Sequence, residues 1–162
     1  MVDKVKVGII GCGNIFPQYI KWTRTFEILD VVSVADMDVS RAQARAQEYT
    51  IPHAYTVAQL LADPAIEIVI NLTVPQAHAE VSLAILNAGK HAYGEKPLGL
   101  TREEGQKILA LAAEKKLLVG CAPDTFLGGG IQTARKVIDD GLIGRPVAAT
   151  AFMCGHGPES WH

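Results

Sequence analysis

The stretch VGIIGCGNIF, residues 7–16, decides the fold. A run rich in β-branched residues, Val5–Ile10, leads directly into two glycines, and a helical pattern follows. Gly11 permits a tight turn, and Gly13 has no side chain to keep a pyrophosphate from the backbone. The helix that starts here offers free N–H groups and the positive end of its dipole. Phe16 fills the third position of G-x-G-x-x-G, so the fingerprint is incomplete and a plain strand–helix turn stays open.

An acidic residue stands at the spacing that this turn requires. Asp36 follows a second apolar run, Val31–Ala35, and lies 36 − 16 = 20 residues after Phe16. A carboxylate there accepts hydrogen bonds from ribose hydroxyls and repels a 2′-phosphate, which favours NAD over NADP as the cofactor. Two alternatives remain: Asp36 caps the next helix, or Arg41 turns toward a phosphate.

Strands and helices alternate outward from this turn. Asp38 is expected to cap a helix through Tyr49, and the capping boxes Thr56–Gln59 and Thr101–Glu104 open two others. The expected strands are Val5–Ile10, Val31–Ala35, Glu67–Leu72, Lys90–Tyr93 and Leu117–Cys121. This order predicts an α/β fold, a Rossmann-type doubly wound parallel sheet with helices on both faces.

The ends of the later strands supply further candidate site residues. Ligands of such sheets bind at the carboxyl ends of the strands, so Thr73, Pro75 and His78 are expected along the path of the cofactor. His78 can equally be a packed histidine. Glu95 can hold the ammonium of Lys96, which could then bond an oxygen at the reacting carbon. The alternative is a surface ion pair at a turn.

Composition excludes several classes of protein. Of the 162 residues, 49% are hydrophobic and 20% charged, and the net charge is −2. A core is therefore expected, and neither nucleic acid nor membrane is an expected partner. Three cysteines without paired spacing predict neither a disulfide framework nor a metal site. The N-terminus has no signal-peptide layout, which suggests the cytoplasm.

The pattern changes after Cys121. A helix is expected over Gly130–Asp140, and Val147–Cys154 alternates like a half-buried strand. A single strand cannot bury its own face. We therefore expect a Rossmann domain at 1–121 and the truncated beginning of an α/β second domain at 122–162. The alternative is an extra edge strand on a complete small module.

The blocks GIIGCGNI, VADMD, NLTVPQAH and AGKHAYGEKPLGLT resemble the Gfo/Idh/MocA oxidoreductases over nearly the whole chain. The resemblance implies a dinucleotide-binding domain followed by a domain that completes the substrate site and carries a homo-oligomer interface. It implies hydride transfer between NAD or NADP and a small-molecule substrate, a sugar, cyclitol or related polyol. Lys96 is then the active-site lysine.

The same resemblance implies more about the site. Gly11, Gly13, Asn14 and Ile15 would bind the dinucleotide, as would Glu95 and Lys96 near its reacting end. Asp124 and Thr125 would lie near the substrate. The family's catalytic histidine belongs to the second domain, and neither His156 nor His162 matches it. The chain alone is expected to bind dinucleotide without turnover. A non-catalytic sensor or repressor of the same fold is the alternative function.

Overall fold

The computed structural model describes residues 4–152, 154, 155 and 157. Within the chain, Met1–Pro123 forms one compact unit and Asp124–His162 another. The first unit contains the sheet and the first five α-helices, and the second contains α6.

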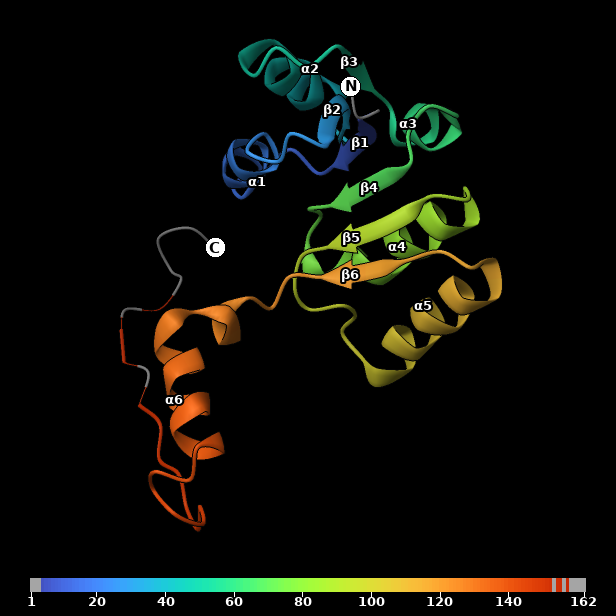
Figure 1. Ribbon diagram of the computed structural model, residues 1–162. Coiled ribbons are helices and arrows are strands. Elements are labelled where there is room, and N and C mark those ends of the chain that lie inside the picture. The colour runs from blue at the N-terminus through green and yellow to red at the C-terminus, as the bar shows by residue number, and fades with distance from the viewer. Residues whose placement is uncertain (1–3, 153, 156, 158–162) are drawn as a thin grey trace. The chain divides into compact units, whose positions relative to one another are not determined.

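The first unit is built on a six-stranded sheet in the order β3-β2-β1-β4-β5-β6 (Figure 1). Every pair of neighbouring strands is parallel. The strands are β1 (Val5–Ile10), β2 (Leu29–Ala35), β3 (His53–Tyr55), β4 (Ile68–Asn71), β5 (His91–Gly94) and β6 (Val119–Cys121). The order reverses between β1 and β4, the switch point at which such sheets bind ligands.

Five α-helices connect these strands. They are α1 (Phe16–Thr23), α2 (Val39–Glu48), α3 (Val57–Ala62), α4 (His78–Asn87) and α5 (Arg102–Lys115). A short 3-10 helix, Pro75–Ala77, precedes α4. The predicted doubly wound α/β fold is therefore confirmed.

Consecutive strand residues enter opposite cores. Ile9 packs with α1 and α2, whereas Ile10 packs with α3, α4 and α5. Because side chains alternate across a strand, this assignment places the two groups of helices on opposite faces of the sheet. Ser33 is fully buried in β2, and its Oγ has no partner among the described residues.

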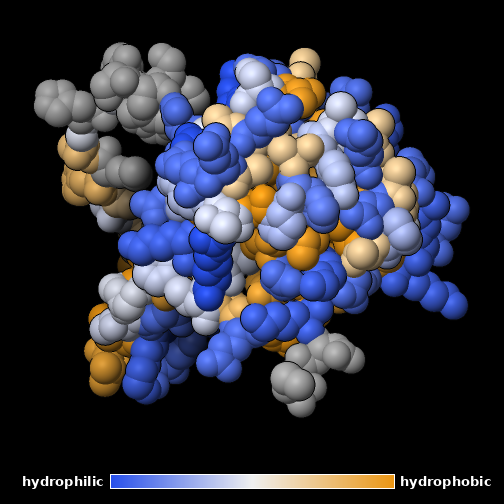
Figure 2. All heavy atoms as spheres, turned by 90° about the horizontal axis from the view of Figure 1, so that it is seen from above, coloured by the Kyte–Doolittle hydropathy of each residue, from blue (hydrophilic) through white to orange (hydrophobic). Residues whose placement is uncertain are grey.

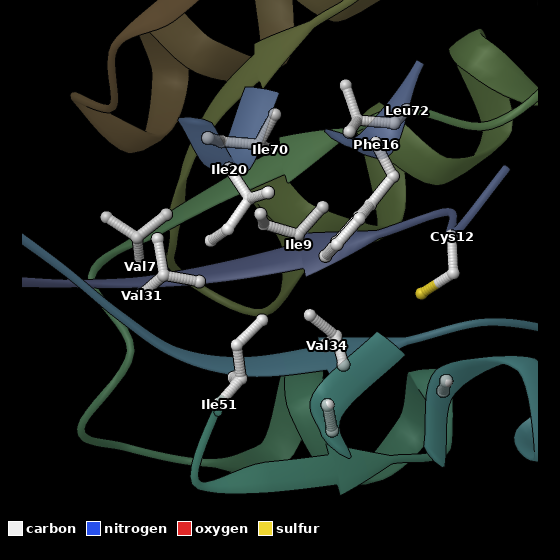
Figure 3. Close-up of a cluster of buried hydrophobic side chains, with 12 residues drawn as sticks. Val7, Ile9, Cys12, Phe16, Ile20, Val31, Val34, Ile51, Ile70 and Leu72 are labelled. Atoms are coloured by element: carbon white, nitrogen blue, oxygen red, sulfur yellow. The ribbon is translucent and has the colours of Figure 1, made fainter. Parts of the chain in front are cut away.

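The core beneath α1 fixes the glycine turn. Phe16 and Ile20 are fully buried, and Figure 3 shows them directed toward Ile9 of β1. Phe16 also contacts Tyr49 edge-on, with 5.5 Å between ring centroids. Phe16, at the third position of the glycine fingerprint, thus anchors α1 to the core.

The face drawn in Figure 2 is mainly hydrophilic, with apolar side chains between polar ones, as is usual for a folded surface.

The predicted helix caps are present. Oδ1 of Asp38 accepts hydrogen bonds at the start of α2, and both capping boxes close. Gly89 ends α4 with φ +76°. Several bounds differ from expectation: β2 begins at Leu29 rather than Val31, β6 begins at Val119 rather than Leu117, and β4 and β5 differ by one residue at each end. Strand β3 is additional. Strand β3 has only three residues, too few for alternation to be visible in the sequence.

The second unit begins with the 3-10 helix Thr125–Leu127 and continues with α6 (Gly129–Asp139). The expected helix is confirmed within one residue at each end. The expected strand over Val147–Cys154 is wrong where the structure describes it, because residues 147–152 form no strand. Sheet hydrogen bonds need a neighbouring strand, and residues 147–152 pair with none. No helix in the described part of the chain is long and apolar enough to cross a membrane.

Candidate functional site

The candidate site lies where the parallel strands end. The strands β1, β2, β4 and β5 lead into Gly11, Asp36, Thr73 and Glu95 respectively. Since all six strands run in one direction, these residues share one edge of the sheet, on both sides of the switch point.

Gly11 and Gly13 serve the turn in different ways. Gly11 has φ +103°, and an added Cβ would lie 2.6 Å from the carbonyl carbon and oxygen of Leu72. Only glycine fits there, because the turn passes against the end of β4. An added Cβ at Gly13 would meet nothing within 4 Å. The backbone is therefore open at Gly13, which suits the approach of a pyrophosphate.

The start of α1 adds to this opening. Ile15 is the N-cap of α1 and is 41% exposed, and no side chain caps the helix. Asn14 is exposed beside it. The N–H groups of Phe16 and Gln18 donate to carbonyls of the turn, and Pro17 has no N–H. Among the described residues, no hydrogen bond engages the N–H groups at positions 13–15, which can therefore bind an anion. The turn and the helix start therefore fit the diphosphate of a dinucleotide.

Asp36 is held close to the glycine turn. It is 8% exposed, and its Oδ2 accepts a 2.8 Å hydrogen bond from the Cys12 N–H. Its Oδ1 accepts from the Asp38 N–H at 3.0 Å. The guanidinium of Arg41 lies 3.5 Å from Oδ1 of Asp36, and it also lies 3.8 Å from Oδ2 of Asp38. The carboxylate is thus fixed by backbone donors, and it can accept further hydrogen bonds from ribose hydroxyls.

Two neighbours of this carboxylate have local roles. Burial and then the Asp36 carboxylate raise the pKa of the Cys12 thiol to about 12, while Arg45 and Arg41 act in the opposite direction. Cys12 is therefore a neutral, packed thiol at physiological pH. Nε of Arg45 donates to the Cys12 carbonyl at 3.3 Å. The sequence gives no sign of this contact, because Arg45 looks like any charged residue of an exposed helix face.

Asn71 organises the loop between β4 and α4. It is fully buried, and its Nδ2 donates to the His78 carbonyl and to Ser82 Oγ at 3.0 and 3.1 Å. Its Oδ1 accepts from the N–H and the hydroxyl of Thr73 at 3.2 and 2.6 Å. Each polar atom of the amide is satisfied. A polar residue at the end of a buried strand was the signal that could have identified Asn71.

Thr73, Pro75 and His78 lie in this loop and at its end. The Thr73 hydroxyl bonds to Asn71, and Pro75 begins the 3-10 helix. His78 is 3% exposed. Its Nδ1 lies 2.6 Å from the Pro97 carbonyl oxygen, and its Nε2 lies 2.9 Å from the Thr73 carbonyl oxygen. The packed histidine that the sequence left open is therefore what the structure shows, with both ring nitrogens facing backbone oxygens.

Glu95 and Lys96 differ from the expected ion pair. Glu95 Oε1 accepts a 2.7 Å hydrogen bond from the Tyr19 hydroxyl, and its Oε2 accepts from the Lys96 N–H at 3.0 Å. Lys96 is exposed, and in the described part of the chain no hydrogen bond or ion pair engages its ammonium. The Lys96–Pro97 peptide bond is cis. The ammonium is therefore available to an outside acceptor, and the carboxylate holds the backbone of Lys96 instead.

Asp124 and Thr125 belong to the second unit. Asp124 precedes the 3-10 helix as its N-cap, and both residues are exposed. Their closeness to a substrate stays a prediction. His156 and His162 lie outside the described residues. Among the described residues, no group of three His, Cys, Asp or Glu side chains is arranged to hold a metal ion.

Known proteins share this sequence and fold. The chain is 32% identical over 152 residues to a 1,5-anhydro-D-fructose reductase of Ensifer adhaerens, covering 93% of this chain and 46% of the relative. It is 32% identical over 148 residues to an NADP⁺-dependent scyllo-inositol 2-dehydrogenase of Bacillus subtilis, covering 88% and 39%. The chain thus spans less than half the length of these relatives.

A solved structure agrees. The myo-inositol dehydrogenase of Lactobacillus casei, in complex with NAD(H) and myo-inositol, superposes with a TM-score of 0.81 at 30% identity, covering 91% of this chain and 44% of that one. Residues 5–122 match the family described as "Oxidoreductase family, NAD-binding Rossmann fold", GFO_IDH_MocA. The chain therefore belongs to the Gfo/Idh/MocA oxidoreductases and contains their NAD-binding Rossmann domain.

Proposed function

We propose that this chain is the dinucleotide-binding half of an NAD-dependent dehydrogenase or reductase whose substrate is a sugar, cyclitol or related polyol. The observation that carries the proposal is Lys96, an exposed ammonium without a partner among the residues that the structure describes, at the edge of the sheet that also holds Gly13 and Asp36. The substrates in the names of the relatives support the choice of substrate class.

Different residues of this chain bind the diphosphate, bind the ribose and stabilise charge on the substrate. The open backbone at Gly13 and the uncapped start of α1 bind the diphosphate, and Asp36 accepts from the ribose. When bound, NAD would supply the acceptor for a hydride from the carbinol carbon, and NADH would supply the donor in the reverse direction. Lys96 donates a hydrogen bond to the substrate oxygen and stabilises the charge that develops there.

The oxidation also releases a proton from the hydroxyl group. In the complete enzyme, we assign that proton to an acid/base group in the part of the relatives that this chain does not span. The 162-residue chain then binds the dinucleotide but has little turnover. Homo-oligomerisation of the complete enzyme is part of the same proposal, in line with the family resemblance.

The test is Lys96→Met in the complete enzyme. Removing one preorganised donor should lower kcat by roughly 10²-fold or more. The dissociation constant for NAD should change much less, because other residues hold the adenosine half. Arg102→Met is the control, an exposed cation in the first turn of α5. Unchanged kcat in Lys96→Met, with intact NAD binding, would contradict the catalytic role of Lys96. Absence of turnover in the unmodified complete protein, with NAD bound, would instead favour the sensor or repressor function.

A further inference from the structure

The turn that carries Lys96 is held at both ends by side chains from other elements. Tyr19 of α1 reaches Glu95 on one side of Lys96, at 2.7 Å. His78 of α4 reaches the carbonyl of Pro97 on the other side, at 2.6 Å. Tyr19 and Glu95 are 76 residues apart in sequence, and His78 and Pro97 are 19 apart.

We propose that Tyr19 and His78 are positioning residues that clamp the Glu95–Lys96–Pro97 turn and so aim the Lys96 ammonium. This proposal rests on the proposed function, because it assumes that Lys96 bonds the reacting oxygen. It assigns to these two residues the orientation of Lys96 and no direct contact with the reacting atoms.

The Tyr19 hydroxyl controls what Glu95 can bind. One carboxylate oxygen of Glu95 accepts from Tyr19, and the other accepts from the Lys96 N–H. Each oxygen of Glu95 therefore has a donor, and the bond to Tyr19 fixes the direction in which the carboxylate points. Without the hydroxyl, the carboxylate is free to turn and bind the adjacent ammonium, since a cation is a stronger donor than water. Tyr19 thus keeps Lys96 available to an outside acceptor.

His78 ties the same turn to the neighbouring loop. Its Nε2 lies 2.9 Å from the Thr73 carbonyl oxygen and its Nδ1 lies 2.6 Å from the Pro97 carbonyl oxygen, and each contact is a hydrogen bond when that nitrogen carries a proton. The Thr73 end is fixed in turn by Asn71, which is fully buried. The turn after β5 is therefore connected to the rigid end of β4 through a side chain that is itself 3% exposed.

The clamp also connects two ends of the proposed cofactor site. Tyr19 lies on the fourth position of α1, whose N-terminus would bind the diphosphate. Lys96 would act at the reacting end. A shift of about 1 Å in a catalytic group can cost on the order of 10²-fold in rate, so a contact that fixes this distance has a measurable effect.

The first experiment tests the clamp without catalysis. Amide hydrogen exchange is measured by NMR on the 162-residue chain for Tyr19→Phe and for the control Tyr55→Phe, which makes the same change on β3 at the far edge of the sheet. Tyr19→Phe should speed exchange of the Lys96 amide by about tenfold, and the amides of β1 and β4 should keep their protection. Unchanged exchange at Lys96 would overturn the proposal.

The second experiment uses the complete enzyme. Tyr19→Phe should lower kcat by about tenfold with little change in the NAD dissociation constant, and Tyr55→Phe should change neither. His78→Asn, which cannot span both carbonyls, should act like Tyr19→Phe; if it does not fold, Tyr19→Phe alone decides. Full activity of Tyr19→Phe beside an inactive Lys96→Met overturns the clamp alone. Full activity of Lys96→Met overturns the role proposed for Lys96, and absence of turnover in the unmodified complete protein overturns the proposed function. In either case the exchange data still report whether the contact exists.

Discussion

At the scale of single residues, the site depends on side chains that face the backbone. Asp36, Asn71 and His78 each bond to main-chain N–H or C=O groups of another segment, and Glu95 bonds to the N–H of the next residue, Lys96. Such bonds fix the loops at the ends of the strands, where any ligand of the sheet would lie. The residues free to bind something else, above all Lys96, are exposed between these fixed points.

We predict that Asp36 determines the choice between NAD and NADP. We expect the chain to bind NAD more tightly than NADP, because a buried carboxylate repels a 2′-phosphate. Asp36→Ala should weaken NAD binding by about 1–3 kcal/mol, and Asp36→Asn should narrow the difference between the two cofactors. Isothermal titration calorimetry with NAD and NADP measures both effects.

The control for this prediction is Asp30→Asn. Asp30 lies near the start of β2, at the opposite edge of the sheet, where it pairs with Lys6 at 2.5 Å. The same loss of charge there should leave both affinities unchanged. Equal affinity of the unmodified chain for NAD and NADP would contradict the role assigned to Asp36, and Arg41 would then be the residue to examine.

At the scale of elements, local signals predicted most of the fold. Capping residues act within four positions of the helix that they start, so Asp38, Thr56 and Thr101 could be recognised from spacing alone. The expected strand over residues 147–154 is absent where the structure describes it. Alternation of apolar and polar residues predicts which side chains a strand would bury, but it does not show whether a neighbouring strand is present to pair with it. The Tyr19–Glu95 bond was equally invisible, because 76 residues separate its partners.

The contacts of the buried Lys90 also could not be predicted from the sequence. It is 4% exposed, and its Nζ donates to the carbonyls of Asp63 and Ile66 at 2.5 and 2.8 Å. Burial lowers the pKa of this lysine, and the nearby Asp63 opposes the shift. The sequence placed Lys90 only as the first residue of a strand. Its function as a tie between the end of α3 and the start of β5 depends on tertiary contacts.

The capping box of α5 offers a test at this scale. Thr101→Ala removes the hydroxyl that accepts from the Glu104 N–H at 3.2 Å, and it should lower the free energy of unfolding by about 1 kcal/mol. Urea unfolding followed by circular dichroism measures the change. Thr101→Ser keeps the hydroxyl and should remain close to the unmodified chain. An equal loss in both variants would show that the threonine methyl group, not the cap, stabilises the helix.

At the scale of the whole molecule, the two units differ in what they bury. The first unit has a core on each face of its sheet. In α6 no residue is buried. Ile131 and Ile138 are seven positions apart and therefore share one side of the helix, at 52% and 43% exposure. The pairs Arg135–Asp139 and Lys136–Asp140 add charged contacts along the same helix.

An apolar stripe of this kind favours association, so the 162-residue chain should self-associate as its concentration rises. Light scattering across a concentration series should show an increasing average mass. Ile131→Lys combined with Ile138→Lys should reduce that increase, because two charges on the stripe oppose its burial. Thr133→Lys adds a charge to another side of α6 and should have little effect. A constant monomer mass, with α6 strongly protected from hydrogen exchange, would show that the stripe is covered within one chain.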